Sequence, residues 1–499
     1  MQTAQFVSSN RSIASARALR GRKLTRERYD LVVIGAGSGG YAAARTARDL
    51  GAGVALVDQG PLGGLCILRG CMPSKALLAS SDAAQDARDA GELGVKIAGV
   101  AVDMPFIAER KRRLVRDFAD YRIEGIETFP VFAGKAHFLS PTEVRVGDDT
   151  VLEAAHFIIA TGSSVSQVGI PGLAQAGYLD TDSVLELERV PESTIVLGGG
   201  YTACELGQFL SRMGSRVTML IRSGHLLTEQ DDDIGDALTQ YYRDEGIDVV
   251  SRTQLDRVEM RDGRKIVFAH VDGEEREFAA EEIFYALGRT PNVAGLGLDN
   301  ANVAYHPVGG IDVDLTLRTS NPAIFAVGDV TGEYLLVHVA IYQGEIAARN
   351  AVMKSFEHAD YRIVPAFTVF SEPQVALVGA SEKTLQRDGI LYVVGRYDFA
   401  EHGKALCLNR TKGFVKILAD PDSGLILGAS IIGPQASELI HEMIVAMNYH
   451  ATVEQFMRIP HLHPTLAEIW TYPAEECAAQ LGMRAPVDQM IEVATSSAR

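Results

Sequence analysis

The chain has 499 residues, enough for two to four domains with substantial cores, and its 47% hydrophobic and 22% charged residues are ordinary for a soluble globular protein. A formal net charge of −17 argues against nucleic acid or an anionic membrane surface as the main partner. Five cysteines, an odd number in so long a chain, exclude an extracellular disulfide framework, and no apolar run of membrane-spanning length is present.

Residues 1–28 form a basic N-terminal extension. They contain six arginines, Lys23 and four serines, and Glu27 is the only acid. This composition resembles a mitochondrial transit peptide, but no cleavage signal is evident and the segment runs into the first predicted strand. We therefore expect a disordered extension on a cytoplasmic protein, with the mitochondrial matrix as the alternative location.

The first predicted nucleotide site lies in "YDLVVIGAGSGGYAAARTARDLGAGVALVDQG", which begins at Tyr29. The pattern predicts a strand, a glycine turn with Gly35, Gly37 and Gly40, a helix, and a second strand that ends at Asp58. The glycines allow a pyrophosphate to approach the helix N–H groups, and the acid can bind a ribose hydroxyl. We expect a dinucleotide here.

Cys66 and Cys71 stand five residues apart in "GGLCILRGCMPSKALL". On a regular helix their Cα atoms would lie roughly 8.6 Å apart, beyond the ~4.4–6.8 Å that a disulfide usually spans. A disulfide therefore needs an irregular first turn, which Gly70 and Pro73 could shape. Two small buried thiols are the alternative at this point.

A second nucleotide unit follows in "STIVLGGGYTACELGQFLSRMGSRVTMLIRSG", with Gly198, Gly200 and Ala203 at the turn. Gly35 and Asp58 are 23 positions apart, and the same count from Gly198 reaches Ile221, followed by Arg222. No acid is present there to bind the free 2′-hydroxyl of the NAD ribose, whereas the guanidinium of Arg222 can bind the 2′-phosphate of NADP. NADP(H) is therefore favoured over NAD(H), with an unliganded surface arginine as the alternative.

Three shorter stretches continue the pattern. "ATG" with Thr161 and Gly162, and "ALGRTPN" with Gly288, are typical of returns between two nucleotide domains. "AVGD" places Asp329 at the C-terminal edge of a strand, where ligands of open α/β sheets bind.

"HLHPTLAEIW", near the C-terminus, contains His463 and, five residues later, Glu468. A histidine is a natural base for thiol–disulfide exchange. His461 is the rival, and we interpret it as structural because only His463 is followed by PTxxE.

Taken together, residues 29–475 resemble the flavin-dependent pyridine nucleotide–disulfide oxidoreductases. The resemblance rests on the two predicted nucleotide units, CxxxxC followed by PSK, "AVGD" and "HLHPTLAE". The resemblance implies FAD in the first unit and NAD or NADP in the second. It also implies a redox-active disulfide in which Cys71 faces the flavin and Cys66 exchanges with substrate. His463, oriented by Glu468, would serve the partner subunit's disulfide in an obligate homodimer. Lys75 would pair with Glu205, and Asp329 would hold the ribityl chain. With Arg222 from the spacing above, the candidate cofactor-binding residues are Gly35, Gly37, Gly40, Asp58, Gly64, Lys75, Thr161, Gly162, Asp329, Gly198, Gly200, Glu205, Arg222 and Gly288.

Within the family, the segment from Ser437 to Glu468 is most similar to lipoamide dehydrogenases, and "RVTMLIRSGHLL" resembles mercuric reductases. The expected substrate is dihydrolipoamide or a lipoylated protein. The alternatives are an NADPH-dependent disulfide reductase, a mercuric-reductase-like enzyme, or a low-turnover flavin redox sensor. Metal reduction as the main activity is disfavoured because Cys477 is solitary near the C-terminus. Two departures stand out: Arg222 where these enzymes usually keep an acid, and His450 where the family usually has glycine.

The expected fold class is α/β, with two Rossmann-like domains and a C-terminal α+β dimerisation domain. We expect FAD-binding parts at 29–165 and 289–361, an NAD(P)-binding domain at 166–288 and an interface domain at 362–499. Cys204 is expected to pack in a core, Trp470 in a core or the dimer interface, and Cys407 in the core of a strand.

Overall fold

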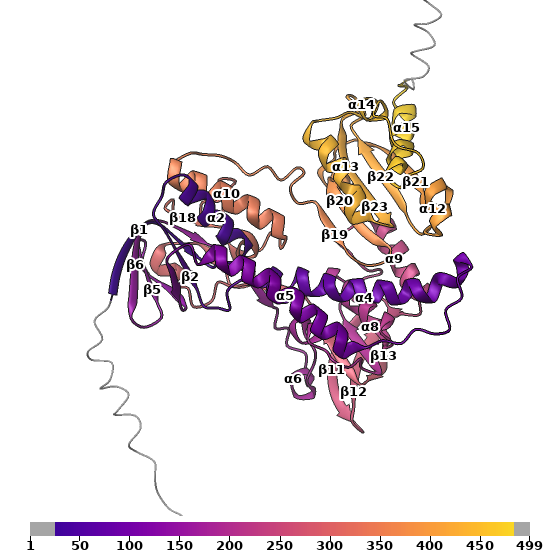
Figure 1. Cartoon of the computed structure of the whole chain (residues 1–499), viewed down its shortest axis with the longest axis horizontal. Helices are drawn as coiled ribbons and strands as arrows, with labels where there is room; N and C mark the ends of the chain where they lie inside the picture. Colours follow the sequence, from indigo (N-terminus) through magenta and orange to yellow (C-terminus); the bar gives the residue numbers. More distant parts are fainter. Residues whose placement is uncertain (1–24, 484–499) are drawn as a thin grey trace, which may run out of the picture. The chain divides into compact units, whose positions relative to one another are not determined.

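The computed structural model describes residues 25–483 of the protein (Figure 1). Residues 1–24, and with them the transit-peptide hypothesis, lie outside the described residues. The chain divides into two compact units. The first comprises the described residues up to Gly64, Arg122–Ser163 and Pro291–Ala359; the second comprises Leu65–Tyr121, Ser164–Thr290 and the described residues from Asp360 on.

The first unit is built on a seven-stranded sheet in the order β3-β2-β1-β6-β5-β4, with β18 also pairing β6. β1 (Thr25–Ile34) is parallel to both β2 (Val54–Asp58) and β6 (Thr150–Ile159). It begins inside the expected basic extension, because residues 25–28 pair with β6. The other strands are β3 (Val131–Ala133), β4 (Ala136–Ser140), β5 (Glu143–Val146) and β18 (Ile324–Ala326).

Two helices of this unit, α2 (Ser38–Asp49) and α10 (Val337–Met353), pack closely against each other (Figure 1). Small residues make this approach possible. A Cβ on Gly39 would lie 2.9 Å from the carbonyl oxygen of Ala340, and one on Gly344 would lie 2.3 Å from that of Gly39. This packing holds α2, and therefore the glycine turn before it, in place against the sheet.

The second unit contains a four-stranded parallel sheet in the order β10-β9-β8-β14. Its strands are β8 (Ser193–Leu197), β9 (Arg216–Leu220), β10 (Asp248–Val250) and β14 (Glu282–Tyr285). Every residue of β8 is buried, as expected for a parallel strand covered on both faces. Helix α8 (Tyr201–Arg212) follows β8 directly and completes a second strand–glycine turn–helix unit. An antiparallel sheet of β11 (Thr253–Arg261), β12 (Arg264–Val271) and β13 (Glu274–Ala280) follows.

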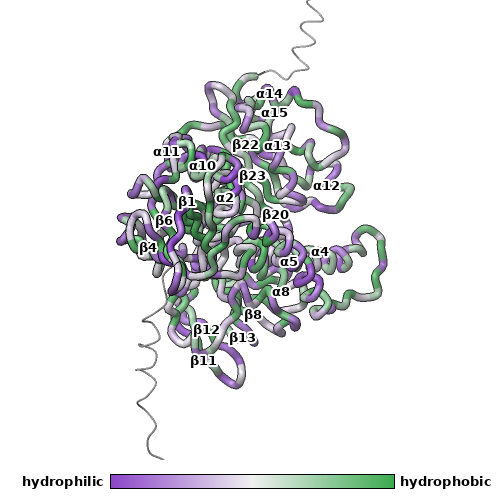
Figure 2. The backbone as a smooth tube through the Cα atoms, turned by 60° about the vertical axis from the view of Figure 1, so that its left-hand side comes forward, coloured by the Kyte–Doolittle hydropathy of each residue, from purple (hydrophilic) through white to green (hydrophobic). Residues whose placement is uncertain are grey.

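The C-terminal part of this unit is a five-stranded antiparallel sheet in the order β19-β20-β23-β22-β21. Its strands β22 and β23 are mostly hydrophobic (Figure 2), with Lys416 and Ser430 as polar exceptions in the sequence. Helices α13 (Ala436–Asn448) and α15 (Thr471–Gln480) contact this sheet. The strands are β19 (Phe367–Val369), β20 (Gln374–Gly379), β21 (Val393–Asp398), β22 (Phe414–Ala419) and β23 (Ile426–Gly433).

The remaining main helices lie between these strands along the chain or follow them. They are α3 (Leu65–Arg69), α4 (Cys71–Asp89), α5 (Met104–Ile126), α6 (Leu173–Ala176), α7 (Thr181–Leu185), α9 (Asp232–Asp244), α11 (Glu382–Asp388), α12 (Gly403–Leu408) and α14 (Val453–Met457). Over residues 25–483 no helix has the length and apolarity needed to span a bilayer. The expected α/β class with a C-terminal α+β part is confirmed.

The cysteines outside the thiol pair and the single tryptophan differ in burial. Cys204 and Trp470 are fully buried in hydrophobic clusters, as expected. The prediction for Cys407 is wrong: it lies on the short helix α12 and its side chain is exposed. The apolar letters around it, "ALCLN", fit a strand equally well, and Leu406 and Leu408 beside it are exposed too.

Candidate active site

The thiol pair lies where two helices meet. Cys66 is on α3, and Cys71 is the first residue of α4. Gly70 separates them with φ −134° and ψ −117°, which breaks the helix between the two cysteines. A Cβ on Gly70 would lie 3.0 Å from the carbonyl oxygen of Leu65 and 3.1 Å from the Cα of Cys66. Gly70 thus provides the irregular turn that a Cys66–Cys71 bond requires.

The structure holds both cysteines as thiols, with a hydrogen bond between their sulfurs. This hydrogen bond from Cys66 lowers the pKa of the Cys71 thiol to about 7, against burial, which raises it. The charge of Lys75 lowers the pKa further, and that of Glu205 raises it. Since the thiolate is the reactive form, Cys71 is activated near neutral pH.

Lys75, one turn after Cys71, forms the expected ion pair with Glu205. Its Nζ donates to Glu205 Oε2 at 2.7 Å, and the carboxylate is only 9% exposed. The other oxygen, Oε1, accepts the backbone N–H of Phe370 at 3.0 Å. The ammonium also lies 4.2 Å from the centre of the Phe370 ring. Buried charges need such pairing, and both oxygens of Glu205 are satisfied here.

His463 and Glu468 form a second polar group. Nδ1 of His463 lies 2.9 Å from Glu468 Oε2. The His463 side chain is 78% exposed, whereas that of Glu468 is 11% exposed. A buried carboxylate holding an exposed imidazole fixes which ring nitrogen carries hydrogen and leaves Nε2 free to accept a proton.

His461, the rival histidine, is held on both sides. Nδ1 lies 2.9 Å from the carbonyl oxygen of Ile459, and Nε2 lies 2.6 Å from the half-buried carboxylate of Glu442. Its side chain is only 8% exposed. With both ring nitrogens engaged, His461 has a structural position.

The first glycine turn fits a dinucleotide. Gly37 is the N-cap of α2, and no side chain caps this end of the helix by a hydrogen bond. A Cβ on Gly37 would meet nothing within 4 Å among the described residues. Gly35 has φ +104° and lies against Ala160, so only glycine fits there. A Cβ on Gly40 would lie 1.8 Å from Gly35 O. An open, uncapped helix N-terminus is the site that a pyrophosphate needs.

The segment that leads to the thiols begins beside this turn. Gly64 has φ +80°, and a Cβ on it would lie 2.8 Å from the Cα of Gly37. Gly64 therefore allows the backbone before Cys66 to touch the first glycine turn, within the first unit.

Two acids of the first unit accept hydrogen bonds from nearby groups. Asp58 accepts the backbone N–H groups of Ala36 and Gly60, each at 2.7 Å. Asp329 accepts the hydroxyl of Ser163 at 2.5 Å. Each carboxylate retains lone pairs for a ligand hydroxyl. Nearby, Thr161 and Asn292 exchange hydrogen bonds with each other's backbone, and Gly162 has φ +71°.

The second glycine turn repeats the arrangement. Gly200 is the N-cap of α8 without a side-chain cap, and a Cβ on it would meet nothing within 4 Å among the described residues. A Cβ on Gly198 would lie 2.5 Å from Ala286 O, and buried Ala203 fills the third position. Gly288, at φ +105°, accepts the N–H of Ser166 at 3.0 Å through its carbonyl oxygen.

Arg222 lies two residues beyond the end of β9. Ile221 is buried beneath the turn at Gly199, whereas Arg222 is exposed and has no hydrogen bond or ion pair with any residue of the described range 25–483. A free guanidinium at the end of this strand can receive an anionic group.

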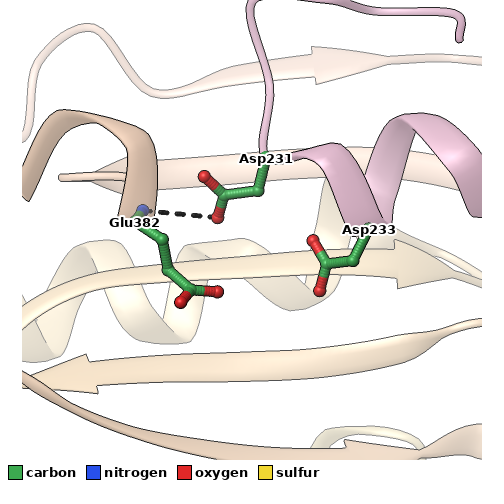
Figure 3. A group of neighbouring side chains, drawn as sticks. All are labelled: Asp231, Asp233 and Glu382. Carbon is green, nitrogen blue, oxygen red and sulfur yellow. Dashed lines mark hydrogen bonds between the residues drawn. The ribbon is translucent and has the colours of Figure 1, made fainter. Parts of the chain in front are cut away.

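A separate group of three carboxylates lies at the start of α9. Oxygens of Asp231, Asp233 and Glu382 lie within 4.8 Å of one another (Figure 3). The buried ammonium of Lys416 donates to all three, at 2.9, 3.0 and 2.7 Å. The lysine offsets one of the three negative charges, and the group links α9, α11 and β22 as a structural ion network.

Sequence reasoning missed three residues of these groups: Ser163, Phe370 and His402. Ser163 directly follows the "ATG" that holds Gly162, so its contact with Asp329 could have been proposed. Phe370 reaches Glu205 through its backbone, which no side-chain pattern reveals. His402 lies 3.6 Å from Glu468 from a distant segment, without any motif.

Most of the chain matches one family of known proteins. The sequence pattern of the family described as "Pyridine nucleotide-disulphide oxidoreductase" matches residues 29–344, and that of its dimerisation domain matches residues 365–474.

Individual relatives cover nearly the whole chain. A dihydrolipoyl dehydrogenase of Chlamydia pneumoniae is 34% identical over 89% of this chain and 96% of its own length. A mercuric reductase of Streptomyces lividans is 35% identical over 88% and 94%. Among solved structures, the HOCl-induced flavoprotein disulfide reductase RclA from Escherichia coli matches with a TM-score of 0.80 and 26% identity, covering 90% of this chain and 99% of that one.

Proposed function

Because this chain belongs to the pyridine nucleotide–disulphide oxidoreductases, we propose that it moves electrons between a dithiol substrate and NAD(P) through Cys66 and Cys71. The observation that carries the proposal is the pair of cysteines on either side of the helix break at Gly70, followed by the half-buried Lys75–Glu205 ion pair. The proposed substrate is dihydrolipoamide or a lipoyl group on a protein. The dihydrolipoyl dehydrogenases among the relatives support this choice.

The proposed exchange follows from the two thiols. A substrate thiolate attacks Cys66 Sγ in the Cys66–Cys71 disulfide, the sulfur–sulfur bond breaks, and Cys71 leaves as a thiolate. The second substrate thiol then attacks the substrate sulfur bound to Cys66, which releases the oxidised substrate and the Cys66 thiol. A leaving thiol with a low pKa departs faster, so the environment of Cys71 favours its role. His463, held by Glu468, takes the proton from the attacking thiol.

Bound FAD would carry the electron pair between the dithiol and the nicotinamide. Gly35, Gly37 and Gly40 would hold its pyrophosphate, Asp58 its ribose, and Asp329 its ribityl chain. Lys75 and Glu205 remain as a fixed ion pair next to Cys71. Gly198 and Gly200 would hold the pyrophosphate of the second nucleotide.

A second candidate is the opposite direction, the reduction of a disulfide by NADPH. The exposed Arg222 favours it, because this residue can bind the 2′-phosphate that distinguishes NADP(H). The named disulfide reductase among the structural relatives is consistent with this direction. In either direction we propose a cytoplasmic homodimer in which His463 acts on the partner's thiol pair; the dimerisation domain supports the dimer.

The test is dihydrolipoamide oxidation by the FAD-loaded protein, with NAD+ and NADP+ in parallel. His463→Gln should lower kcat by about 100-fold, the usual scale for loss of a general base. The matched control is His461→Gln, two residues away, whose ring is engaged on both sides and which should stay within about three-fold of wild type.

Three outcomes would contradict the proposal in different ways. Equal activity of His463→Gln and wild type would remove His463 from the mechanism. Turnover with glutathione disulfide and NADPH, but none with lipoamide, would replace the substrate. A protein that binds FAD but turns over none of these would be a redox sensor.

A further inference from the structure

His402 lies behind the His463–Glu468 pair, and neither the family motifs nor the proposed mechanism uses it. It is fully buried, at 0% exposure, and forms the N-cap of α12. Its Nδ1 accepts the backbone N–H of Ala405 at 3.4 Å. A nitrogen that accepts carries no hydrogen, so the hydrogen of the neutral ring is on Nε2.

Nε2 points at the carboxylate that orients His463. It lies 3.6 Å from Glu468 Oε1 and has no hydrogen-bond partner among the described residues. The distance is longer than a hydrogen bond, so the attraction is between the N–H dipole and the carboxylate charge. Within residues 25–483, no other donor contacts Oε1, and the Glu468 side chain is only 11% exposed.

Aromatic neighbours hold the ring of His402 in this orientation. Its centroid lies 6.4 Å from that of Phe399 and 6.2 Å from that of Tyr472, and both contacts are edge-to-face. Burial lowers the pKa of His402, the Glu468 charge raises it and the His463 charge lowers it. The ring is therefore neutral at pH 7 and gives Glu468 a donor without adding a competing cation.

We propose that His402 is a positioning residue: its buried Nε2–H faces Oε1 of Glu468 and keeps Oε2 turned toward Nδ1 of His463. One carboxylate is thus shared by two imidazoles, an exposed one that receives the proton and a buried one that holds the carboxylate. Without His402, no N–H dipole would face the charge on Oε1, and the buried carboxylate would rotate toward another polar group.

A double-mutant cycle tests the proposal, which rests on the proposed function for its kinetic part. His402→Leu in the FAD-loaded protein should lower kcat for dihydrolipoamide oxidation by about ten-fold. In a Glu468→Gln background the same change should cost less than about two-fold, because His402 acts only through Glu468. His402→Gln, whose amide nitrogen reaches the position of Nε2, should stay within about three-fold of wild type.

Controls separate positioning from folding. Ser381→Ala removes the N-cap of α11, which does not touch Glu468, and should leave kcat unchanged. If His402→Leu does not fold, His402→Asn replaces it in the cycle, because Asn keeps the cap of α12 and lacks a donor at Nε2. An unchanged kcat in the single variant, or an equal loss in both backgrounds, would overturn the proposal.

A substrate-independent readout separates this inference from the proposed function. 15N NMR of the His463 ring, assigned with His463→Gln, reports whether Nδ1 carries hydrogen. We expect Nδ1–H in wild type and His402→Gln, and a mixture of tautomers in His402→Leu. The same spectrum in all three proteins would overturn the role of His402. A wild type that does not turn over dihydrolipoamide would reject only the substrate.

Discussion

The reactivity of the thiol pair is set by a few neighbouring groups. Cys71 has a hydrogen bond from Cys66 and the nearby charges of Lys75 and Glu205, and none of the groups that shift its pKa is a histidine. The remaining buried cysteines, Cys204 and Cys477, have thiol pKa values raised by burial. Of these three cysteines, only Cys71 has a lowered thiol pKa, which prepares it for exchange near neutral pH.

This contrast leads to a prediction for Cys66→Ala. The hydrogen bond from Cys66 is the largest influence that lowers the pKa of Cys71, so its loss should raise that pKa above about 7. The thiolate fraction at pH 7 should fall, and iodoacetamide should alkylate Cys71 about five-fold more slowly, with the rate recovering as the pH rises.

The measurement is the alkylation rate of the reduced protein between pH 5 and pH 10. Both proteins carry Cys407→Ala, because Cys407 is exposed, and peptide mass spectrometry separates the label on Cys71 from that on the half-buried Cys66. A Cys66→Ala profile that coincides with that of the parent, or moves to lower pH, would contradict the assigned cause.

At the scale of elements, two helix boundaries show where this chain follows or departs from its family. Gly70 breaks the path between α3 and α4 and gives the thiols their irregular turn. At the end of α13, His450 has φ +55°, and its N–H donates to Met447 O. The next N–H, of Ala451, donates to Ala446 O, which completes a left-handed helix cap. The family's usual glycine is therefore explained by backbone conformation.

His450→Gly should accordingly stabilise the protein by about 0.5–1 kcal/mol, because glycine adopts this conformation without steric cost. The matched control is Tyr449→Gly, one residue earlier at φ −95°, where glycine should destabilise by a similar amount. The midpoint of thermal unfolding should move up in the first variant and down in the second. If the unfolding midpoint falls equally in both variants, the His450 side chain stabilises the protein by more than its backbone strain destabilises it.

For the whole molecule, the proposal places His463 at the thiol pair of the other subunit. Mixing Cys66→Ser with His463→Gln protein tests this arrangement. In a mixed dimer, one site would combine an intact thiol pair with an intact His463, and the other would lack both. Each parent alone should be nearly inactive, and subunit exchange should restore about a quarter of the wild-type activity, since half of the dimers are mixed and each has one working site.

Subunit exchange is promoted by brief partial denaturation and checked by mass spectrometry of the mixed dimers. The control is wild type taken through the same treatment. If mixed dimers form and remain as inactive as the parents, the base and the thiols act within one chain.

The sequence alone determined the order of the parts, because local patterns encode them: buried strands before glycine turns, CxxxxC with PSK, and HP with its glutamate. These features depend on near neighbours in the chain, and so the α/β class, both glycine turns and the His463–Glu468 contact could be predicted.

Only the tertiary structure decided which distant side chains share a site. Phe370 meets Glu205 across 165 positions and His402 meets Glu468 across 66, and such contacts follow from strand order and packing that no local period records. The same holds for Cys407, where an apolar stretch fits a helix or a strand equally well until the surrounding core selects one.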